Sequence, residues 1–344
     1  MKNRLFKVLL VAIGLLGTTG SGWGASQLWD GGATTPIWDT KKNWLSQKVP
    51  GPADDVTFGS GFASGLSIDL AGPPPLTANS LTIDTITGFS LNNNTLTLTS
   101  GNLTRNDVAG TEADQQINSS VVLGGPGVLN INGSGTLLMA DVTASHGFVK
   151  SGGGTLKLGG IVTSSSILSE AITINAGTLL LGAANRISDN SPIRLAGGTF
   201  ATGGFSETVG ALTLTASSQI NLGAGSSSLV FSSSSGVAWT AGAMLTIQNW
   251  SGSATDRVYV GSSSGGLNTG QVSQIRFDSP QGLVGFYNAQ ILGSGEIVPL
   301  IVPIPEPATL VGAAMLGLFV SFRERKMSSC QSQPEHGCGQ ALDL

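Results

Sequence analysis

The chain has 344 residues, of which only 10% are charged, and its formal net charge is −4. It contains no stripe of Lys and Arg, so nucleic acid is not an expected partner. Both cysteines lie after residue 326, so disulfides cannot hold the long central part of the chain together.

The N-terminus has the three parts of an export signal. Basic residues within the first seven positions precede an apolar stretch, Val8–Leu16. Gly22 and Gly24 then place small residues at positions −3 and −1 of a cleavage site between Gly24 and Ala25. A membrane anchor is the alternative, but nine apolar residues are too few to span a bilayer. We therefore predict that residues 1–24 are a signal peptide, used for export through the Sec translocon.

Residues 25–65 carry three tryptophans set among Asp and Asn. Trp29, Trp38 and Trp44 fall within sixteen positions of one another. One interpretation is a platform of exposed rings on which carbohydrate stacks. The other is a cap with buried rings, which covers the open end of a stack of β-strands. The Trp-Asp and Asn-Trp phrases resemble the start of many autotransporter-type passenger proteins, and this resemblance favours the cap.

Residues 66–236 alternate apolar and polar side chains, which is typical of β-strands. A Gly-Thr-Leu phrase recurs around Thr136, Thr155, Thr178 and Thr199, at separations of 19, 23 and 21 residues. This period predicts a β-solenoid, in which each coil turns at glycines and stacks a strand on the next coil. A β-sandwich would also give short alternating strands, but it does not favour one phrase at a near-constant period.

The repeats resemble the autotransporter-associated β-strand repeat, most closely in residues 149–160 and 174–179. That resemblance implies a right-handed parallel β-helix, and it covers roughly residues 133–204. The repeat pattern of the sequence changes after Phe231. We predict that residues 237–301 form about five short strands that cap the C-terminal end and cover exposed strand edges.

A proline-rich spacer and an apolar run follow. The prolines in residues 303–307 favour extended backbone, and Ala308–Phe322 contains no charge. Arg323, Arg325 and Lys326 then supply the basic cluster that stops the transfer of a membrane helix. Fifteen residues span about 23 Å, less than the ~30 Å hydrocarbon core, so a buried core helix is an alternative. The absence of a polar face and the basic end favour a short transmembrane helix.

The phrase Pro305-Glu306-Pro307, with the helix and basic residues after it, resembles the PEP-CTERM sorting signal of Gram-negative, exopolysaccharide-producing bacteria. In that family exosortase, a membrane-embedded cysteine peptidase, recognises the signal and is thought to cut at the motif. The resemblance implies exosortase as a partner, a membrane-inserted precursor, and a mature form at the cell surface, in the outer membrane or outside the cell. An ordinary C-terminal anchor is the alternative.

Residues 327–344 depart from that family, whose members usually end soon after the basic cluster. This polar tail contains Cys330, His336 and Cys338. Two cysteines and one histidine are an incomplete ligand set for a structural metal. We therefore expect a tail without a function of its own, and neither a metal nor another cofactor.

Groups that could carry catalysis are sparse. His146 is the one histidine before the tail, and its turn of small residues predicts an exposed side chain. No acidic residue recurs at the repeat period, and Asp54 and Asp55 should point to opposite sides of an extended segment. Because β-helices also include polysaccharide-degrading enzymes that use acidic clusters, a secreted enzyme of that kind is the alternative function.

The sequence thus predicts an all-β, exported, non-enzymatic protein of the cell surface or extracellular matrix. The resemblance to sorted proteins implies a structural or adhesive role associated with exopolysaccharide or biofilm. The predicted layout is a signal peptide (1–24), an N-terminal cap (25–65), a β-helix (66–236), a C-terminal β cap (237–301), a PEP-CTERM signal with its transmembrane helix (302–326) and a polar tail (327–344).

Overall fold

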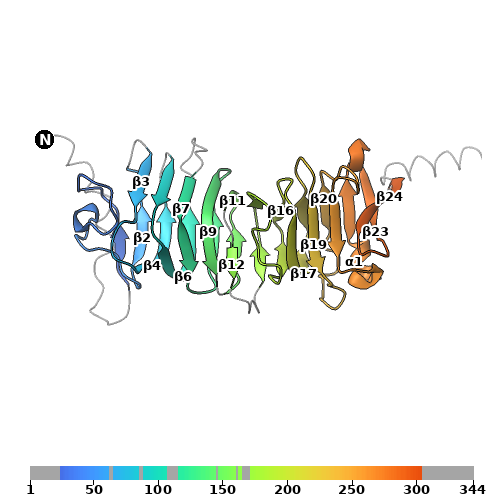
Figure 1. The fold of residues 1–344 in the computed structure, drawn as a ribbon, viewed down its shortest axis with the longest axis horizontal. Coiled ribbons are helices and arrows are strands. Elements are labelled where there is room, and N and C mark those ends of the chain that lie inside the picture. The colour runs from blue at the N-terminus through green and yellow to red at the C-terminus, as the bar shows by residue number, and fades with distance from the viewer. Residues whose placement is uncertain are drawn as a thin grey trace, which may run out of the picture. The chain divides into compact units, whose positions relative to one another are not determined.

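The computed structural model describes residues 24–61, 65–84, 88–106, 115–144, 146–159, 162–164 and 171–303. Over these residues the chain is all-β and forms a parallel β-solenoid, which confirms the predicted all-β solenoid architecture (Figure 1). The chain divides into two compact units, Met1–Leu300 and Ile301–Leu344, and the solenoid belongs to the first.

Strands account for most of the regular structure. Their bounds are β1 Ser26–Leu28, β2 Asp55–Phe58, β3 Leu66–Asp69, β4 Leu76–Ile83, β5 Phe89–Asn92, β6 Leu96–Arg105, β7 Gln115–Leu123, β8 Val128–Ile131, β9 Thr136–Ala144, β10 Val149–Ser151, β11 Thr155–Leu158, β12 Val162–Ser164, β13 Ile172–Ile174, β14 Thr178–Leu181, β15 Ile193–Ala196, β16 Thr199–Ala201, β17 Glu207–Ala216, β18 Ser218–Asn221, β19 Ser228–Ser232, β20 Leu245–Gln248, β21 Arg257–Val260, β22 Ile275–Asp278, β23 Phe286–Ile291 and β24 Ile297–Pro303. The helical elements of the described residues are the α-helix α1 Thr269–Ser273 and the 3₁₀ turns Lys41–Asn43, Ser264–Gly266 and Pro280–Gly282.

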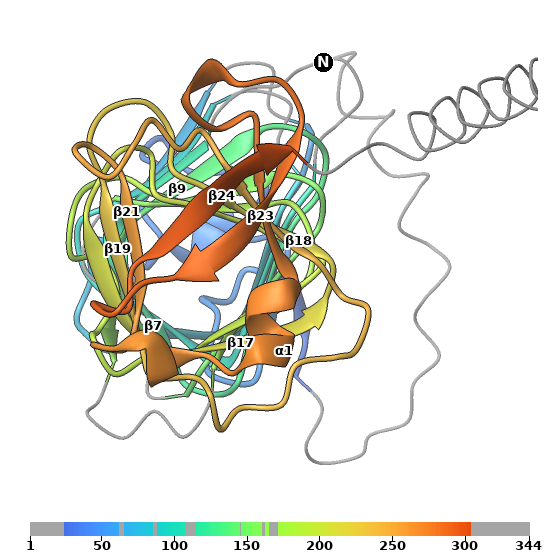
Figure 2. The ribbon, with the colours of Figure 1, turned by 90° about the vertical axis from the view of Figure 1, so that its right-hand side faces the viewer.

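Strands of successive coils pair in parallel, one coil behind the next (Figure 2). Their registers define three ladders. The first ladder runs through β1, β2, β4, β6, β8, β10, β13, β15 and β17. The second runs through β3, β5, β7, β9, β11, β14, β16, β18, β20 and β22. The third contains other parts of the long strands, such as the first half of β17, which pairs with β19 and through it with β21.

The core consists of columns of buried apolar side chains. Alternate positions of each strand face inward, and the register brings equivalent positions of neighbouring coils together. The column of the second ladder contains Leu137, Leu156, Leu179, Phe200, Ile220, Ile247 and Phe277. Each coil therefore buries its apolar side chains against its two neighbours, and stability depends on contacts between coils.

The repeat threonines stack as the sequence predicts. Thr136 pairs with Thr155, Thr155 with Thr178, and Thr178 with Thr199, so all four share one outward column. The separations between them in the sequence are unequal because the turns differ in length, whereas the strands stay in register. The Gly-Thr-Leu phrase is thus the structural repeat of the solenoid.

Glycine is required where the turns of neighbouring coils touch. Gly177 has a φ of +63°, and a Cβ added there would collide with the carbonyl oxygens of Gly152 and Gly154. A Cβ added at Gly236 would meet nothing within 4 Å.

Substitution of these two glycines should therefore have different outcomes. We expect Gly177→Ala to lower the free energy of unfolding by about 2 kcal/mol or more, from a left-handed backbone that L-residues disfavour plus the clash. Gly236→Ala should change it by less than about 0.5 kcal/mol. Urea denaturation of both variants measures the difference, and equal midpoints would show that the Gly177 turn relaxes at no cost.

The two ends of the described solenoid are built differently. At the N-terminal end Trp29, Trp38 and Trp44 pack edge to face at centroid distances of 5.0 Å, and Phe58 lies beneath them. In the C-terminal region β20, β21 and β22 continue the parallel ladders, and β23 then pairs antiparallel with β22. Parallel stacking therefore extends beyond residue 236. The Gly-Thr-Leu phrase is lost there, but alternate side chains of these strands are still buried.

The predicted transmembrane helix, Ala308–Phe322, lies outside the described residues, and the handedness implied by the repeat resemblance stays a prediction. No helix in the described part of the chain is both long and apolar enough to cross a membrane.

Candidate functional site

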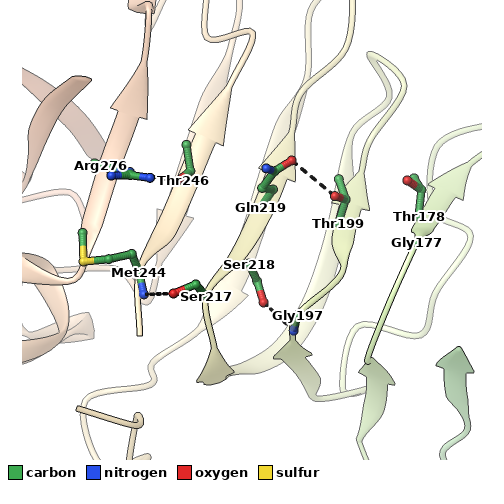
Figure 3. A pocket seen from close by; sticks show the side chains of 10 residues that line it. All are labelled: Gly177, Thr178, Gly197, Thr199, Ser217, Ser218, Gln219, Met244, Thr246 and Arg276. Carbon is green, nitrogen blue, oxygen red and sulfur yellow. Dashed lines mark hydrogen bonds between the residues drawn. The ribbon is translucent and has the colours of Figure 1, made fainter. Parts of the chain in front are cut away.

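A shallow polar groove of about 370 Å³ lies on the outer side of the second ladder, across β14, β16, β18, β20 and β22 (Figure 3). Thr178, Thr199, Gln219, Thr246 and Arg276 follow one another across it in register. Each coil contributes one polar side chain, at the ~4.8 Å spacing of paired strands. The groove can therefore offer hydrogen bonds at regular intervals to an extended polar molecule.

Arg276 is the charged residue of this groove. Its Nε donates to the hydroxyl of Thr246 at 3.0 Å, and its Cζ lies 4.0 Å from the ring centroid of Phe286. The stacking and the hydrogen bond fix the plane of the guanidinium group. The groove thus ends in an ordered guanidinium donor.

A second groove, of about 670 Å³, crosses the first ladder over β2, β4, β6, β8 and β10. Its outward column contains Thr82, Thr104, Asn130 and Ser151 in register. Asp55 is the charged residue that lines it, and its Oδ1 accepts hydrogen bonds from Asn79 and Ser80. This groove is also polar, with neutral groups along most of its length.

Amide side chains bridge the coils elsewhere on the surface. Asn106 donates to the carboxylate of Asp84 at 2.6 Å, and Asn132 donates to the side-chain oxygen of Asn106 at 2.6 Å. Asn118 and Asn92 make the same kind of link, at 2.8 Å. These ladders join residues of successive coils and add polar contacts to the apolar stacking.

Lys150 occupies an inward position of the first ladder, where the neighbouring coils place Leu129 and Ile174. It is fully buried, and its ammonium donates to the carbonyl oxygens of Ser151, Gly152 and Ala176 at 2.8, 2.9 and 3.1 Å. Burial lowers the pKa of Lys150 to about 8. The ammonium therefore satisfies carbonyls of two adjacent turns, a contact that the sequence analysis missed.

Glu207 is a second titratable group inside the core. It pairs with Leu229 in the third ladder and is 1% exposed. Its Oε2 accepts hydrogen bonds from the backbone amides of Arg186 at 2.7 Å and Ile187 at 3.4 Å, whereas its Oε1 has no partner among the described residues. Burial raises the pKa of Glu207 to about 7, although these amides act against the rise.

The tryptophans of residues 25–65 do not form an exposed platform. Trp38 and Trp44 are completely buried and Trp29 is 2% exposed, so none of the three rings can stack on a sugar. Their packing around Phe58 covers the core instead.

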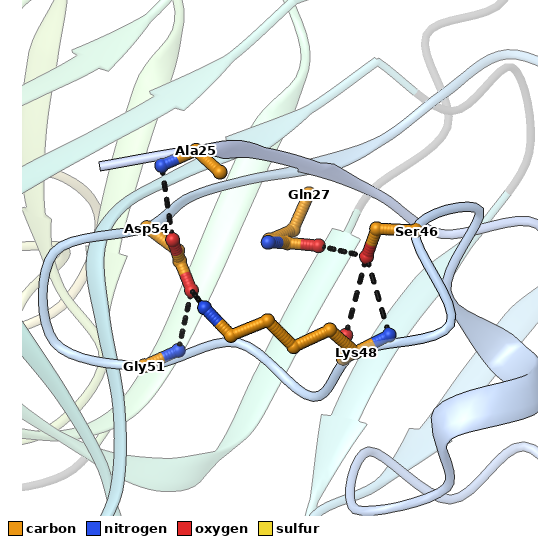
Figure 4. A network of polar contacts seen from close by, with 6 residues as sticks. All are labelled: Ala25, Gln27, Ser46, Lys48, Gly51 and Asp54. Atoms are coloured by element: carbon orange, nitrogen blue, oxygen red, sulfur yellow. Dashed lines mark hydrogen bonds and ion pairs between the residues drawn. The ribbon is translucent and has the colours of Figure 1, made fainter. Parts of the chain in front are cut away.

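Asp54 is the centre of a polar network that joins Ala25, Lys48 and Gly51 (Figure 4). Its Oδ1 accepts from the backbone amide of Ala25 at 2.9 Å, and its Oδ2 accepts from the amide of Gly51 at 2.9 Å and from Lys48 Nζ at 3.2 Å. Burial by itself would raise the pKa of Asp54, but these donors outweigh it and hold the pKa below its usual value. The carboxylate is therefore ionised at neutral pH.

Of the residues predicted from the sequence to form sites, two are described. Gly24 and Ala25 lie at the start of the first strand ladder, next to Asp54. The sorting motif, the basic cluster and the tail lie outside the described residues; they comprise Pro305, Glu306, Pro307, Arg323, Arg325, Lys326, Cys330, His336 and Cys338. His146 is exposed, as its turn predicts.

No group of three or more His, Cys, Asp or Glu side chains that could hold a metal ion occurs in the described ranges. Comparisons with protein family models, with curated proteins and with solved structures found no match. The grooves, the buried charges and the Asp54 network are therefore the features from which a function is argued.

Proposed function

We propose that this chain is an exported, non-enzymatic protein of the cell surface or extracellular matrix, sorted by exosortase through Pro305, Glu306 and Pro307. The observation that carries this proposal is the position of the fold between two signals in the sequence. β1 begins at Ser26, one residue after the proposed signal-peptide cleavage, and β24 ends at Pro303, two residues before the motif. The described strands therefore lie within the interval that such a protein would keep after processing.

The role proposed for the mature protein is structural or adhesive, in association with exopolysaccharide. A right-handed β-helix, the handedness implied by the repeat resemblance, would present the same polar columns on its sides. Hydroxyl, amide and guanidinium donors at strand spacing suit weak, multivalent contact with a polysaccharide chain. The buried columns and amide ladders support a passive role that depends on a persistent shape.

The alternative, a secreted polysaccharide-degrading enzyme, is less well supported. Arg276 is the charged residue that lines the first groove, and Asp55 is the charged residue that lines the second. Glycoside hydrolysis ordinarily uses two carboxyl groups about 5–10 Å apart, across the bond that is cut. Among the described residues that line the two grooves, no such pair occurs.

Processing of the C-terminus provides the direct test. We expect the protein isolated from envelope or medium fractions to have an intact mass that lacks residues 308–344. We expect Glu306→Ala to leave uncut precursor in the inner membrane, because the change removes the carboxylate of the sorting motif.

Asp189→Ala is the matched control, since it removes an exposed carboxylate of the solenoid. This variant should be processed like the wild type. A wild-type mass that retains residues 308–344, or normal surface release of the Glu306 variant, would contradict sorting by cleavage at this motif.

A further inference from the structure

The first strand ladder begins at the residue that follows the predicted signal-peptide cleavage site. The carbonyl oxygen of Ala25 accepts a hydrogen bond from the amide of Asp55 at 3.0 Å, and β1 continues this pairing from Ser26. Ala25 is thus held on its carbonyl side by the backbone of β2. Its amide side faces a different partner.

That partner is the carboxylate of Asp54, which is 4% exposed. The Ala25 nitrogen donates to Oδ1 at 2.9 Å, and Oδ2 is occupied by Gly51 and Lys48 (Figure 4). Lys48 is a weakly held counter-charge because 64% of its side chain is exposed. A buried carboxylate therefore meets a neutral amide at the one nitrogen that cleavage would convert into a cation.

The peptide before Ala25 passes close to the turn that carries Asp54. A Cβ added at Gly24 would collide with the carbonyl oxygen of Ala53. The uncut chain can lie here only because residue 24 has no side chain. Removal of Gly24 would relieve this close approach and leave the Ala25 nitrogen beside Asp54.

We propose that Asp54 is the binding site for the α-ammonium group of the mature chain, and that cleavage completes the N-terminal cap. This inference rests on the export and cleavage between Gly24 and Ala25 that are part of the proposed function. Hydrolysis of that bond consumes one water, leaves a carboxylate on Gly24 and an amine on Ala25. The amine takes up a proton at neutral pH, because an α-amino group has a pKa of about 8.

Replacement of the Ala25 amide by an ammonium group strengthens its contact with the Asp54 carboxylate. The Ala25 amide already donates to an ionised carboxylate, and cleavage makes the donor cationic as well, so an attraction between opposite charges is added to the hydrogen bond. The ammonium is also ordered in advance, since the Ala25 carbonyl is fixed by β2 and no long side chain has to be immobilised. The mature chain therefore holds its first residue more tightly than the precursor does.

Chemical labelling of the exported, full-length mature protein tests this inference. Residues 25–40 contain no lysine, so an acetyl group found there by mass spectrometry marks the α-amine. We expect acetic anhydride at neutral pH to label this amine about ten- to a hundredfold more slowly in the native wild type than in urea, as a hydrogen bond between charged groups implies. Asp54→Asn should abolish most of this protection.

Asp55→Asn is the matched control, because Asp55 bonds Asn79 and Ser80 and its side chain does not contact Ala25. It should keep the wild-type labelling rate. Equal rates for wild type in buffer and in urea would overturn the inference even if Asp54→Asn fails to fold, as would full protection in a folded Asp54→Asn variant.

The same mass spectra separate this inference from the proposed function. A mature chain that begins at a residue other than Ala25 would overturn the inference together with the predicted cleavage position, and would leave C-terminal sorting untouched. A mature Ala25 with an unprotected amine would overturn the inference alone.

Discussion

Phe200→Ala should lower the free energy of unfolding by about 3–5 kcal/mol, among the largest losses expected for a single side chain here. Phe200 is completely buried and lies between Leu179 and Ile220 in the column of the second ladder. Truncation removes apolar area from the core and leaves a cavity that the stacked backbones on both sides cannot readily close. Urea denaturation of the purified protein measures the loss.

Thr178→Ala is the control for this prediction. Thr178 lies in the same ladder but faces outward into the polar groove, so its truncation should change the free energy of unfolding by less than about 0.5 kcal/mol. If Phe200→Ala cost less than about 1 kcal/mol, the inward columns would not be the main source of stability.

The repeat part of the fold follows closely from the sequence. Alternating side chains decide which positions are buried, and the Gly-Thr-Leu phrase decides which strands stack, as the register from Thr136 to Thr199 shows. The separations in sequence vary because turns can change in length without moving the strands. Helix α1 was missed because its five residues have no apolar period. It depends on the capping box of Asn268 and Gln271.

The buried charges are harder to predict, because their compensation is non-local. Lys150 and Glu207 stand at positions that alternation makes inward, but a charged side chain is ordinarily taken to face water. The partners of Lys150 include a carbonyl from the next coil, 26 residues away. The amides that hold Glu207 come from Arg186 and Ile187 of the preceding coil. The sequence marks both sites only by a charged residue at a strand position where the alternation predicts an inward, apolar side chain.

The Asp54 network illustrates the same limit. Alternation separates Asp54 from Asp55, and the structure has Asp54 buried and Asp55 exposed. Sequence spacing gives no reason to pair Asp54 with Ala25, which lies 29 residues earlier. The two meet because β1 and β2 are neighbours in the first ladder. A site that joins two coils can be found only when the register is known.

The second large effect concerns pH. Glu207 has a folded-state pKa of about 7 against an ordinary value of 4.5, so the native state binds more protons than the unfolded state between these values. Its contribution to stability is complete below pH 4.5 and is lost as the pH rises through 7. The loss amounts to about 3 kcal/mol, at 1.36 kcal/mol for each pKa unit. The physical cause is the cost of ionising a carboxyl group whose Oε1 has no partner among the described residues.

Comparison with Glu207→Gln isolates this effect. Other titrating groups, such as Asp54 and Lys150, contribute equally to the pH dependence of both proteins, so their contributions cancel in the difference. Glutamine keeps an oxygen that can accept from the amides of Arg186 and Ile187, but it cannot ionise. The free energy of unfolding of the variant, relative to wild type, should therefore rise by about 3 kcal/mol between pH 4.5 and pH 8. A difference that stays constant over this range would mean that water or a rearranged donor reaches Oε1, and that the core tolerates the charge.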